Sequence, residues 1–181
     1  MENLNDENLV ELVQKGDIEM FGSLVERYEQ KMLRYAGRFL FDHDNAQDAV
    51  QEVFIKAYTN IASFDLTKRF SPWLYRIAHN YFINEIKKKG REPIMSFDAD
   101  IFLPKLFFNN DPEKDILDKE LKELLDLYIN KINSKYKEVL ILYYFEDLSY
   151  REISDILHIP LSAVGIRLNR GKKAMQKIIK I

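Results

Sequence analysis

The 181-residue sequence predicts an all-α fold of two small helical domains joined by an extended linker. Apolar residues recur every three to four positions almost throughout, which is the period of amphipathic helices. Glycine and proline, the residues that most often mark turns, number only six and five. The stretch 91–112 departs from this pattern, because it carries three prolines and no helical period. We therefore expect a first domain over 1–90, a linker over 91–112 and a second domain over 113–181.

Two helices open the first domain, and each has a candidate capping residue. Asp6 or Asn5 can cap a short helix that ends near Gly16, and Asp17 can cap a longer one. The longer helix is expected to bury one face, because its large apolar residues recur at helical spacing. These residues are Phe21, Leu24, Val25, Tyr28, Met32, Tyr35 and Phe39.

Two more helices complete the first domain. A break at 42–45 precedes a third helix, expected over about 46–61 with Val50, Val53, Phe54, Ala57 and Ile61 inward. After a loop over 63–70, Pro72 fits the first turn of a fourth helix that runs through Lys89. Its expected buried row is Trp73 or Leu74, Ile77, Ala78 and Tyr81. Its other side presents Arg76, His79, Asn80, Ile83, Asn84 and Lys87.

The linker is rich in apolar side chains rather than in the glycine and serine of a flexible spacer. These side chains must be buried, either on the protein's own domains or along a partner. Beyond the linker, the apolar spacing predicts helices near 113–130, 133–146, 149–157 and 161–179.

The last two of these helices have the features of a helix-turn-helix. Ser149 and Glu152 can form a capping box, and 158–160 makes a tight turn. The expected buried stripe of the second helix is Leu161, Val164, Leu168, Gly171, Met175 and Ile178. Its outward face carries Ser162, Ala163, Ile166, Arg167, Asn169, Arg170, Lys173 and Lys177. Such cations, amides and small apolar groups suit a DNA major groove, although a purely structural helix pair is the alternative.

Charge is segregated along the chain, although the total is only −2. Residues 68–91 hold seven basic residues and one acidic residue, and residues 158–181 hold six basic residues and no acidic one. A single basic block can be a solvated helix face, but two of equal strength favour nucleic acid as a partner. The first block lies beside the loop 64–70, and its cations, amides and rings suit single-stranded nucleic acid with a flipped base. Trp73 is expected to be part of the core rather than a stacking platform.

The third helix presents an acidic outward face that includes Asp48, Gln51, Glu52 and Ile55. An acidic face does not suit DNA, so it is either solvated surface or the dock for a protein partner. The sequence leaves these two alternatives open.

Catalysis, a metal site and a cofactor are not expected. The chain has no cysteine, and its three histidines lack metal-binding spacing. No glycine-rich loop could cradle a phosphate, so no small-molecule substrate is expected. No apolar run is long enough to cross a bilayer and no signal peptide pattern is present, so we expect a cytoplasmic protein without membrane insertion.

Three segments carry a family resemblance: DNAQDAVQEVFIKAY, FSPWLYRIAHNYFINEIKKK and YKEVLILYYFEDLSYREISDILHIPLSAVGIRLNRGKKAM. In this order and at these separations, they resemble the extracytoplasmic-function (group IV) sigma factors of the bacterial sigma-70 family. The resemblance implies an N-terminal four-helix region 2 domain that melts and reads the minus-ten promoter element. It also implies a C-terminal region 4 domain that reads the minus-35 element by helix-turn-helix, with both domains held on core RNA polymerase.

The resemblance assigns roles by position. Core polymerase would be contacted by Asp48, Gln51, Glu52 and Ile55. The minus-ten strand would be contacted by Lys68, Arg69, Arg76, Asn80, Asn84 and Lys87, with a flipped base held by the loop 64–70. The minus-35 groove would be contacted by Ser162, Ala163, Ile166, Arg167, Arg170 and Lys173. The apolar linker would thread the polymerase.

The sequence departs from the family at two positions of the recognition helix. Family members commonly carry Lys or Arg and then Ser where this chain has Gly165 and Ile166. Loss of the cation is expected to weaken phosphate anchoring, whereas Ile166 can touch a thymine methyl group. No inhibitory segment precedes the first helix, so we expect control by an anti-sigma factor. The alternative functions are a stand-alone helix-turn-helix transcriptional regulator and a protein-interaction module.

Overall fold

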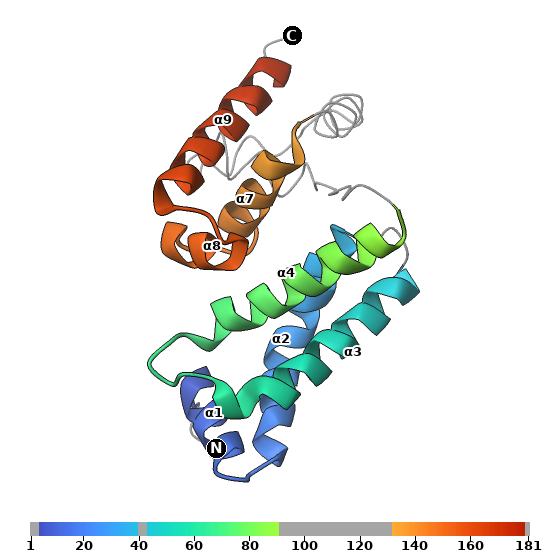
Figure 1. Cartoon of the computed structure of the whole chain (residues 1–181), viewed down its shortest axis with the longest axis vertical. Helices are drawn as coiled ribbons and strands as arrows, with labels where there is room; N and C mark the ends of the chain where they lie inside the picture. Colours follow the sequence, from blue (N-terminus) through green and yellow to red (C-terminus); the bar gives the residue numbers. More distant parts are fainter. Residues whose placement is uncertain (1–3, 40–42, 91–131, 180–181) are drawn as a thin grey trace, which may run out of the picture. The chain divides into compact units, whose positions relative to one another are not determined.

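A computed structural model describes residues 4–39, 43–90 and 132–179, and every regular element among them is a helix (Figure 1). The all-α prediction is therefore confirmed for these residues. The chain divides into two compact units, Met1–Glu92 and Pro93–Ile181. The predicted linker and the helix expected near 113–130 lie outside the described residues.

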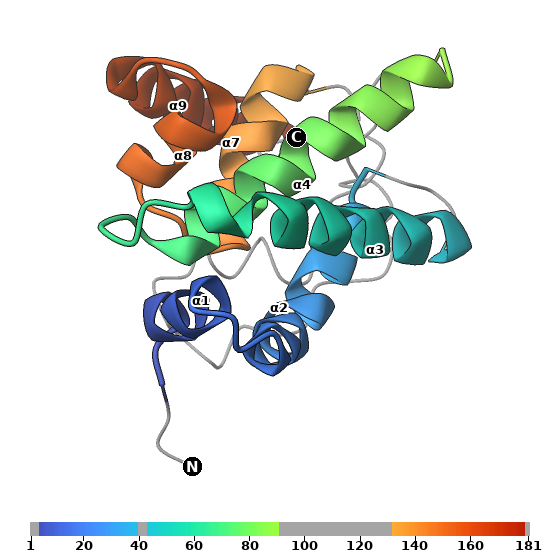
Figure 2. The ribbon, with the colours of Figure 1, turned by 60° about the horizontal axis from the view of Figure 1, so that its bottom comes forward.

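The first unit is built from four α-helices and one short 3-10 turn within its described residues. Helices α1 and α2 lie beneath α3 and α4 in Figure 2. Helix α4 begins one residue before the predicted start, and α3 begins three residues before it. The elements are α1 (Asp6–Gln14), α2 (Glu19–Gly37), α3 (His43–Asn60), η1 (Ile61–Ser63) and α4 (Phe70–Lys88).

The start of α1 confirms one of its two candidate caps, whereas the predicted cap of α2 is wrong. Asn5 caps α1, because its side-chain oxygen accepts from the Asn8 amide at 2.8 Å. The N-cap position of α2 is occupied by Ile18, which already has helical geometry and makes no side-chain cap. The chain turns into α2 at Gly16, whose φ of +104° suits glycine, so Asp17 lies one residue too early to cap the helix.

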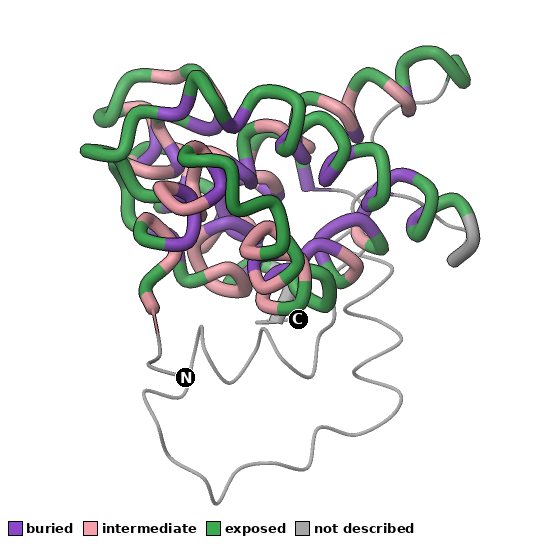
Figure 3. Tube along the Cα trace, turned by 90° about the horizontal axis from the view of Figure 1, so that it is seen from below, coloured by how far each residue is buried: buried purple, intermediate pink, exposed green. Residues whose placement is uncertain are grey.

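A buried aromatic cluster joins α2 to α4 at the centre of the first unit. The Tyr35 ring of α2 is 1% exposed, and its centroid lies 5.3 Å from Tyr75 and 5.9 Å from Phe82 of α4. Phe39 completes the cluster at 5.0 Å from Tyr35. Figure 3 shows buried residues repeating along the inner faces of the helices. Burial of several large rings in edge-to-face and tilted contacts adds to the apolar stabilisation of the unit.

This cluster turns α4 away from the predicted orientation. The buried row is Leu74, Tyr75, Ala78, Phe82 and Ile86, whereas Trp73, Ile77 and Tyr81 are only half-buried. His79, expected on the outward side, is 8% exposed, and its Nδ1 atom lies 3.0 Å from the Tyr35 hydroxyl. The predicted row is therefore confirmed at Leu74 and Ala78 and wrong at Ile77 and Tyr81, because the aromatic partners on α2 favour Tyr75 and Phe82.

Three helices make up the described part of the second unit, and their ranges agree closely with the prediction. They are α7 (Ser134–Tyr144), α8 (Tyr150–Leu157) and α9 (Leu161–Ile179). The buried stripe of α9 contains Val164, Leu168, Gly171 and Met175 as predicted. Leu161, the first residue of α9, is 54% exposed, so its predicted burial is wrong. The side chain of Ile178 lies outside the described residues.

The two glycines of α9 have different surroundings. A Cβ atom at Gly171 would lie 2.8 Å from Cδ1 and 3.1 Å from Cγ of Leu140, which is completely buried in α7. Gly171 therefore lies at a close approach of α9 to α7. A Cβ atom at Gly165 would lie 3.6 Å from the Tyr150 ring, which is an ordinary contact.

This difference predicts opposite effects of Gly→Ala on stability. Alanine improves helix propensity by about 1 kcal/mol at either site. At Gly171 the overpacking against Leu140 costs about 1–3 kcal/mol, so Gly171→Ala should be less stable than its matched control Gly165→Ala by about that amount. Urea unfolding of the full chain followed by circular dichroism measures this difference. Equal stability of the two variants would show that the helices have room to separate.

Candidate nucleic-acid and protein interfaces

An open groove of about 910 Å³ lies in the first unit between α4 and the end of α3. Lys56 and Asn60 of α3, with Ser63 of η1, form one wall. Helix α4 forms the other wall with Trp73, Arg76, Ile77, Asn80, Tyr81, Asn84, Glu85, Lys87 and Lys88. The groove therefore combines cations, side-chain amides and aromatic rings, which are the groups that bind phosphates, base edges and base faces of a single strand.

Four predicted minus-ten residues meet in this groove, and two do not. Arg76, Asn80, Asn84 and Lys87 are exposed, and all four line the α4 wall. Lys68 and Arg69 are exposed in the loop that precedes α4, outside the groove lining. Arg69 instead borders a smaller hollow of about 380 Å³ with residues of α1 and with Arg27 and Ser71. Trp73 is half-buried: it lines the groove and packs on Phe64, with ring centroids 5.1 Å apart.

The sequence prediction missed the α3 wall of the groove. Asp48, Glu52, Lys56 and Asn60 follow one another at four-residue spacing, so they lie along one row of α3, and all are exposed. The row changes from acidic to basic and polar along its length. This change of charge along the row was the sequence signal for the α3 wall. It distinguishes the acidic half of α3 from the half that borders the groove.

One cation–ring contact joins the two walls of the groove, and one ion pair lies within α4. The Lys56 ammonium lies 5.6 Å from the Tyr81 ring centroid across the groove, and Lys88 pairs with Glu85 at 2.7 Å. The hydrogen bond to Glu85 raises the pKa of Lys88. Partial burial, and then Glu85 and Glu52, raise the pKa of the Tyr81 hydroxyl, which therefore stays neutral at physiological pH. The ring of Tyr81 is thus an uncharged surface with the Lys56 ammonium beside it.

The loop between η1 and α4 is an exposed turn, and Ser63 and Trp73 on either side of it line the groove. Phe64 and Phe70 are buried at its ends, and the five residues between them are exposed. Asp65 accepts hydrogen bonds from the amide and hydroxyl of Thr67 at 2.9 and 2.7 Å. These bonds lower the pKa of Asp65, so the turn is closed by an ionised carboxylate.

The acidic face of α3 is solvent-exposed as predicted. Asp48, Gln51, Glu52 and Ile55 are all exposed, and Ile55 is exposed to 55%. A single exposed isoleucine is ordinary at a protein surface, so exposure alone does not decide between solvated surface and a protein dock.

The helix-turn-helix is present in the second unit. Ser149 and Glu152 form the predicted capping box at the start of α8, and His158 ends α8 in a left-handed conformation with φ of 51°. On α9, Ser162, Ile166, Arg170 and Lys173 are exposed, whereas Ala163 and Arg167 are half-exposed. The six predicted minus-35 residues therefore avoid the buried stripe of α9.

The described residues, 4–39, 43–90 and 132–179, hold no cluster of three or more acidic or histidine side chains that could bind a metal ion. No helix in the same ranges has the length and hydropathy needed to span a membrane.

Comparison with known proteins gives matches along both units. Residues 24–92 match Sigma-70 region 2, and residues 122–175 match Sigma-70, region 4. The chain is 36% identical to the ECF RNA polymerase sigma factor SigW of Bacillus subtilis (strain 168), with 93% of each chain covered. It is 35% identical to the ECF RNA polymerase sigma-E factor of Escherichia coli (strain K12), with 96% of this chain and 94% of the relative covered.

A solved structure of CnrH, in complex with the cytosolic domain of CnrY, has a similar fold. Its TM-score is 0.69, with 22% identity and 97% of each chain covered. The region matches and the full-length relatives agree with the helical architecture and with the helix-turn-helix. The chain therefore belongs to the extracytoplasmic-function sigma factors of the sigma-70 family, and it is an RNA polymerase sigma factor rather than an enzyme.

Proposed function

We propose that this sigma factor reads the minus-ten element with the α3–α4 groove and its adjoining loop, and the minus-35 element with α9. The composition of the groove is the observation that carries the proposal. A cationic track alone would suit duplex phosphates, whereas half-exposed rings and three asparagine amides in an open groove suit separated bases.

Within the first domain, 1–90, the residues proposed to contact the minus-ten strand are Lys68, Arg69, Arg76, Asn80, Asn84 and Lys87. Arg76 and Lys87 can bind phosphates, and Asn80 and Asn84 can bond base edges. Lys56 and Asn60 join this set, because they form the opposite wall. The exposed loop 64–70 offers a place for an unstacked base beside the groove.

Within the second domain, 113–181, the residues proposed to contact the minus-35 duplex are Ser162, Ala163, Ile166, Arg167, Arg170 and Lys173. Arg167 and Arg170 can bind phosphate or guanine, and Ile166, 52% exposed, can meet a thymine methyl group. The linker over 91–112 is proposed to lie along the polymerase, since its apolar side chains need a surface to cover them.

Core polymerase is the proposed partner of the acidic half of α3, through Asp48, Gln51, Glu52 and Ile55. An anti-sigma factor is a further proposed partner. The similarly folded sigma factor RpoE of Bartonella quintana was solved in complex with the anti-sigma factor NepR, at a TM-score of 0.66 and 20% identity. The proposed compartment is the cytoplasm, where core polymerase and promoter DNA are found.

Run-off transcription tests the assignment as a whole. Core polymerase is supplied with a library of genomic fragments, with and without the protein, and the transcripts are sequenced. We expect a set of transcripts that depends on the protein and shares two upstream elements. A stand-alone regulator would give no such transcripts, and their absence from every template would contradict the proposal.

Charge reversal on α3 tests the polymerase contact. Glu52→Lys should weaken binding to core polymerase about tenfold or more, because a like charge would face a surface that accepts carboxylates. Glu29→Lys, at an exposed position of α2, makes the same charge change away from this face and serves as the control. Affinity is measured by competition for labelled core enzyme. Equal affinities of the two variants for core polymerase would show that Glu52 does not contact it.

Removal of a recognition-helix cation tests the minus-35 contact. Arg167→Ala should weaken promoter binding by the holoenzyme and lower the slope of log affinity against log salt by about one, because one phosphate contact is lost. Lys135→Ala, at an exposed position of α7, is the control and should leave the slope unchanged. An unaltered slope for Arg167→Ala would show that Arg167 does not bind a phosphate.

A further inference from the structure

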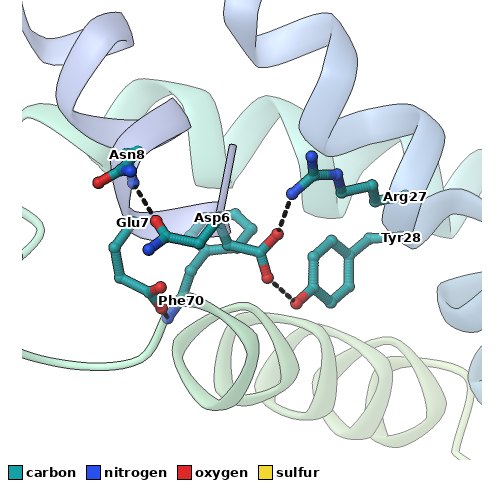
Figure 4. A network of polar contacts seen from close by, with 7 residues as sticks. Asp6, Glu7, Asn8, Arg27, Tyr28 and Phe70 are labelled. Carbon is teal, nitrogen blue, oxygen red and sulfur yellow. Dashed lines mark hydrogen bonds and ion pairs between the residues drawn. The ribbon is translucent and has the colours of Figure 1, made fainter. Parts of the chain in front are cut away.

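Helix α1 holds both ends of the segment that carries the exposed loop. The Gln14 side-chain amide donates to the backbone carbonyls of Ile61 and Phe64 at 2.8 and 3.0 Å. At the other end, the Glu7 carboxylate accepts from the Phe70 amide at 2.9 Å, as Figure 4 shows. Helix α1 thus bonds the backbone at both ends of the loop 64–70, at Ile61 and Phe64 on one side and at Phe70 on the other.

Helix α1 is itself fixed to α2. Asp6 accepts from the Arg27 guanidinium at 2.9 Å and also from the Tyr28 hydroxyl, so it lies between the two side chains (Figure 4). Burial, and then the Asp6 carboxylate, raise the pKa of Tyr28, so its hydroxyl remains a donor. The Tyr28 ring also packs edge-on against Phe70, with centroids 5.6 Å apart. The α1 brace, Glu7 with Gln14, is therefore itself bonded to α2.

The loop is exposed between its two buried ends. Between Phe64 and Phe70 its side chains are exposed, and hydrogen bonds to Asp65 from Thr67 and from the Lys68 amide close its turn. Its buried ends lead directly to the groove: the Phe64 and Phe70 rings lie 6.0 Å apart, and both pack on Trp73. A shift of either end would therefore move the loop and Trp73 together.

We propose that Glu7 and Gln14 are positioning residues for promoter opening: they hold the loop 64–70 and Trp73 in the arrangement that receives an unstacked minus-ten base. This inference rests on the proposed function. Neither residue lines the groove, so neither is expected to touch the base. Each acts through backbone groups, and preorganising those groups lowers the ordering cost of base capture.

Holoenzyme binding to a single-stranded, non-template oligonucleotide tests the inference. The oligonucleotide carries the minus-ten sequence found by run-off transcription, and abasic sites placed one at a time identify the captured base. Gln14→Glu keeps the shape of the side chain. Its second carboxylate oxygen replaces the amide nitrogen that donates to the Ile61 and Phe64 carbonyls, so neither hydrogen bond can form. We expect about tenfold weaker binding of the intact strand, because two hydrogen bonds of ordinary strength are lost.

The abasic strand separates positioning from general damage to the fold. On the strand that lacks the captured base, Gln14→Glu should bind as the unaltered protein does, because the base contact is already absent from both. Glu7 supplies a matched pair: Glu7→Gln keeps an oxygen acceptor for Phe70 and should retain base capture, whereas Glu7→Leu should lose it.

Equal weakening of Gln14→Glu on the intact and abasic strands, or unchanged binding of the intact strand, would overturn the inference. Failure of the proposed function is distinguishable, because the unaltered protein would then give no promoter-specific transcripts at all. Thermal unfolding of each variant accompanies the binding data and shows that α2 and α4 remain packed.

Discussion

The contact between the Tyr35 ring of α2 and the Tyr75 and Phe82 rings of α4 determines how the first unit presents its surface. Burial of these rings sets the rotation of α4 about its axis. Because residues three and four apart share a face, burying Tyr75 and Phe82 leaves Arg76, Asn80 and Asn84 on the groove side. The core therefore selects which polar side chains are available for DNA.

In the second unit, packing between helices also determines which side chains are exposed. Val164, Leu168 and Met175 form the buried stripe of α9, and Gly171 lies in close contact with Leu140 of α7. Arg170 and Lys173 are directed to solvent by this packing. A chain with a net charge of −2 can therefore carry two cationic faces, because the packed apolar stripes sort its charges onto separate surfaces.

The sequence was sufficient to predict the features that depend on residues close together in the chain. Helix order, the capping box of α8 and the outward positions of α9 depend on spacing and on neighbours within one turn. The sequence did not predict features that depend on residues far apart in the chain. His79 is buried against Tyr35, 44 positions away, and Glu7 accepts from the Phe70 amide, 63 positions away. The α3 wall of the groove was missed for the same reason. Lys56 and Asn60 line the groove only because α3 packs beside α4, and the sequence alone does not show that packing.

We expect both cationic faces to act on promoter DNA only when core polymerase presents them together. Equilibrium binding to one promoter fragment, measured for the free protein and for the holoenzyme at the same salt concentration, tests this most directly. With so little net positive charge, the free protein is expected to bind weakly and the holoenzyme tightly. A nanomolar, sequence-specific complex of the free protein would contradict the account.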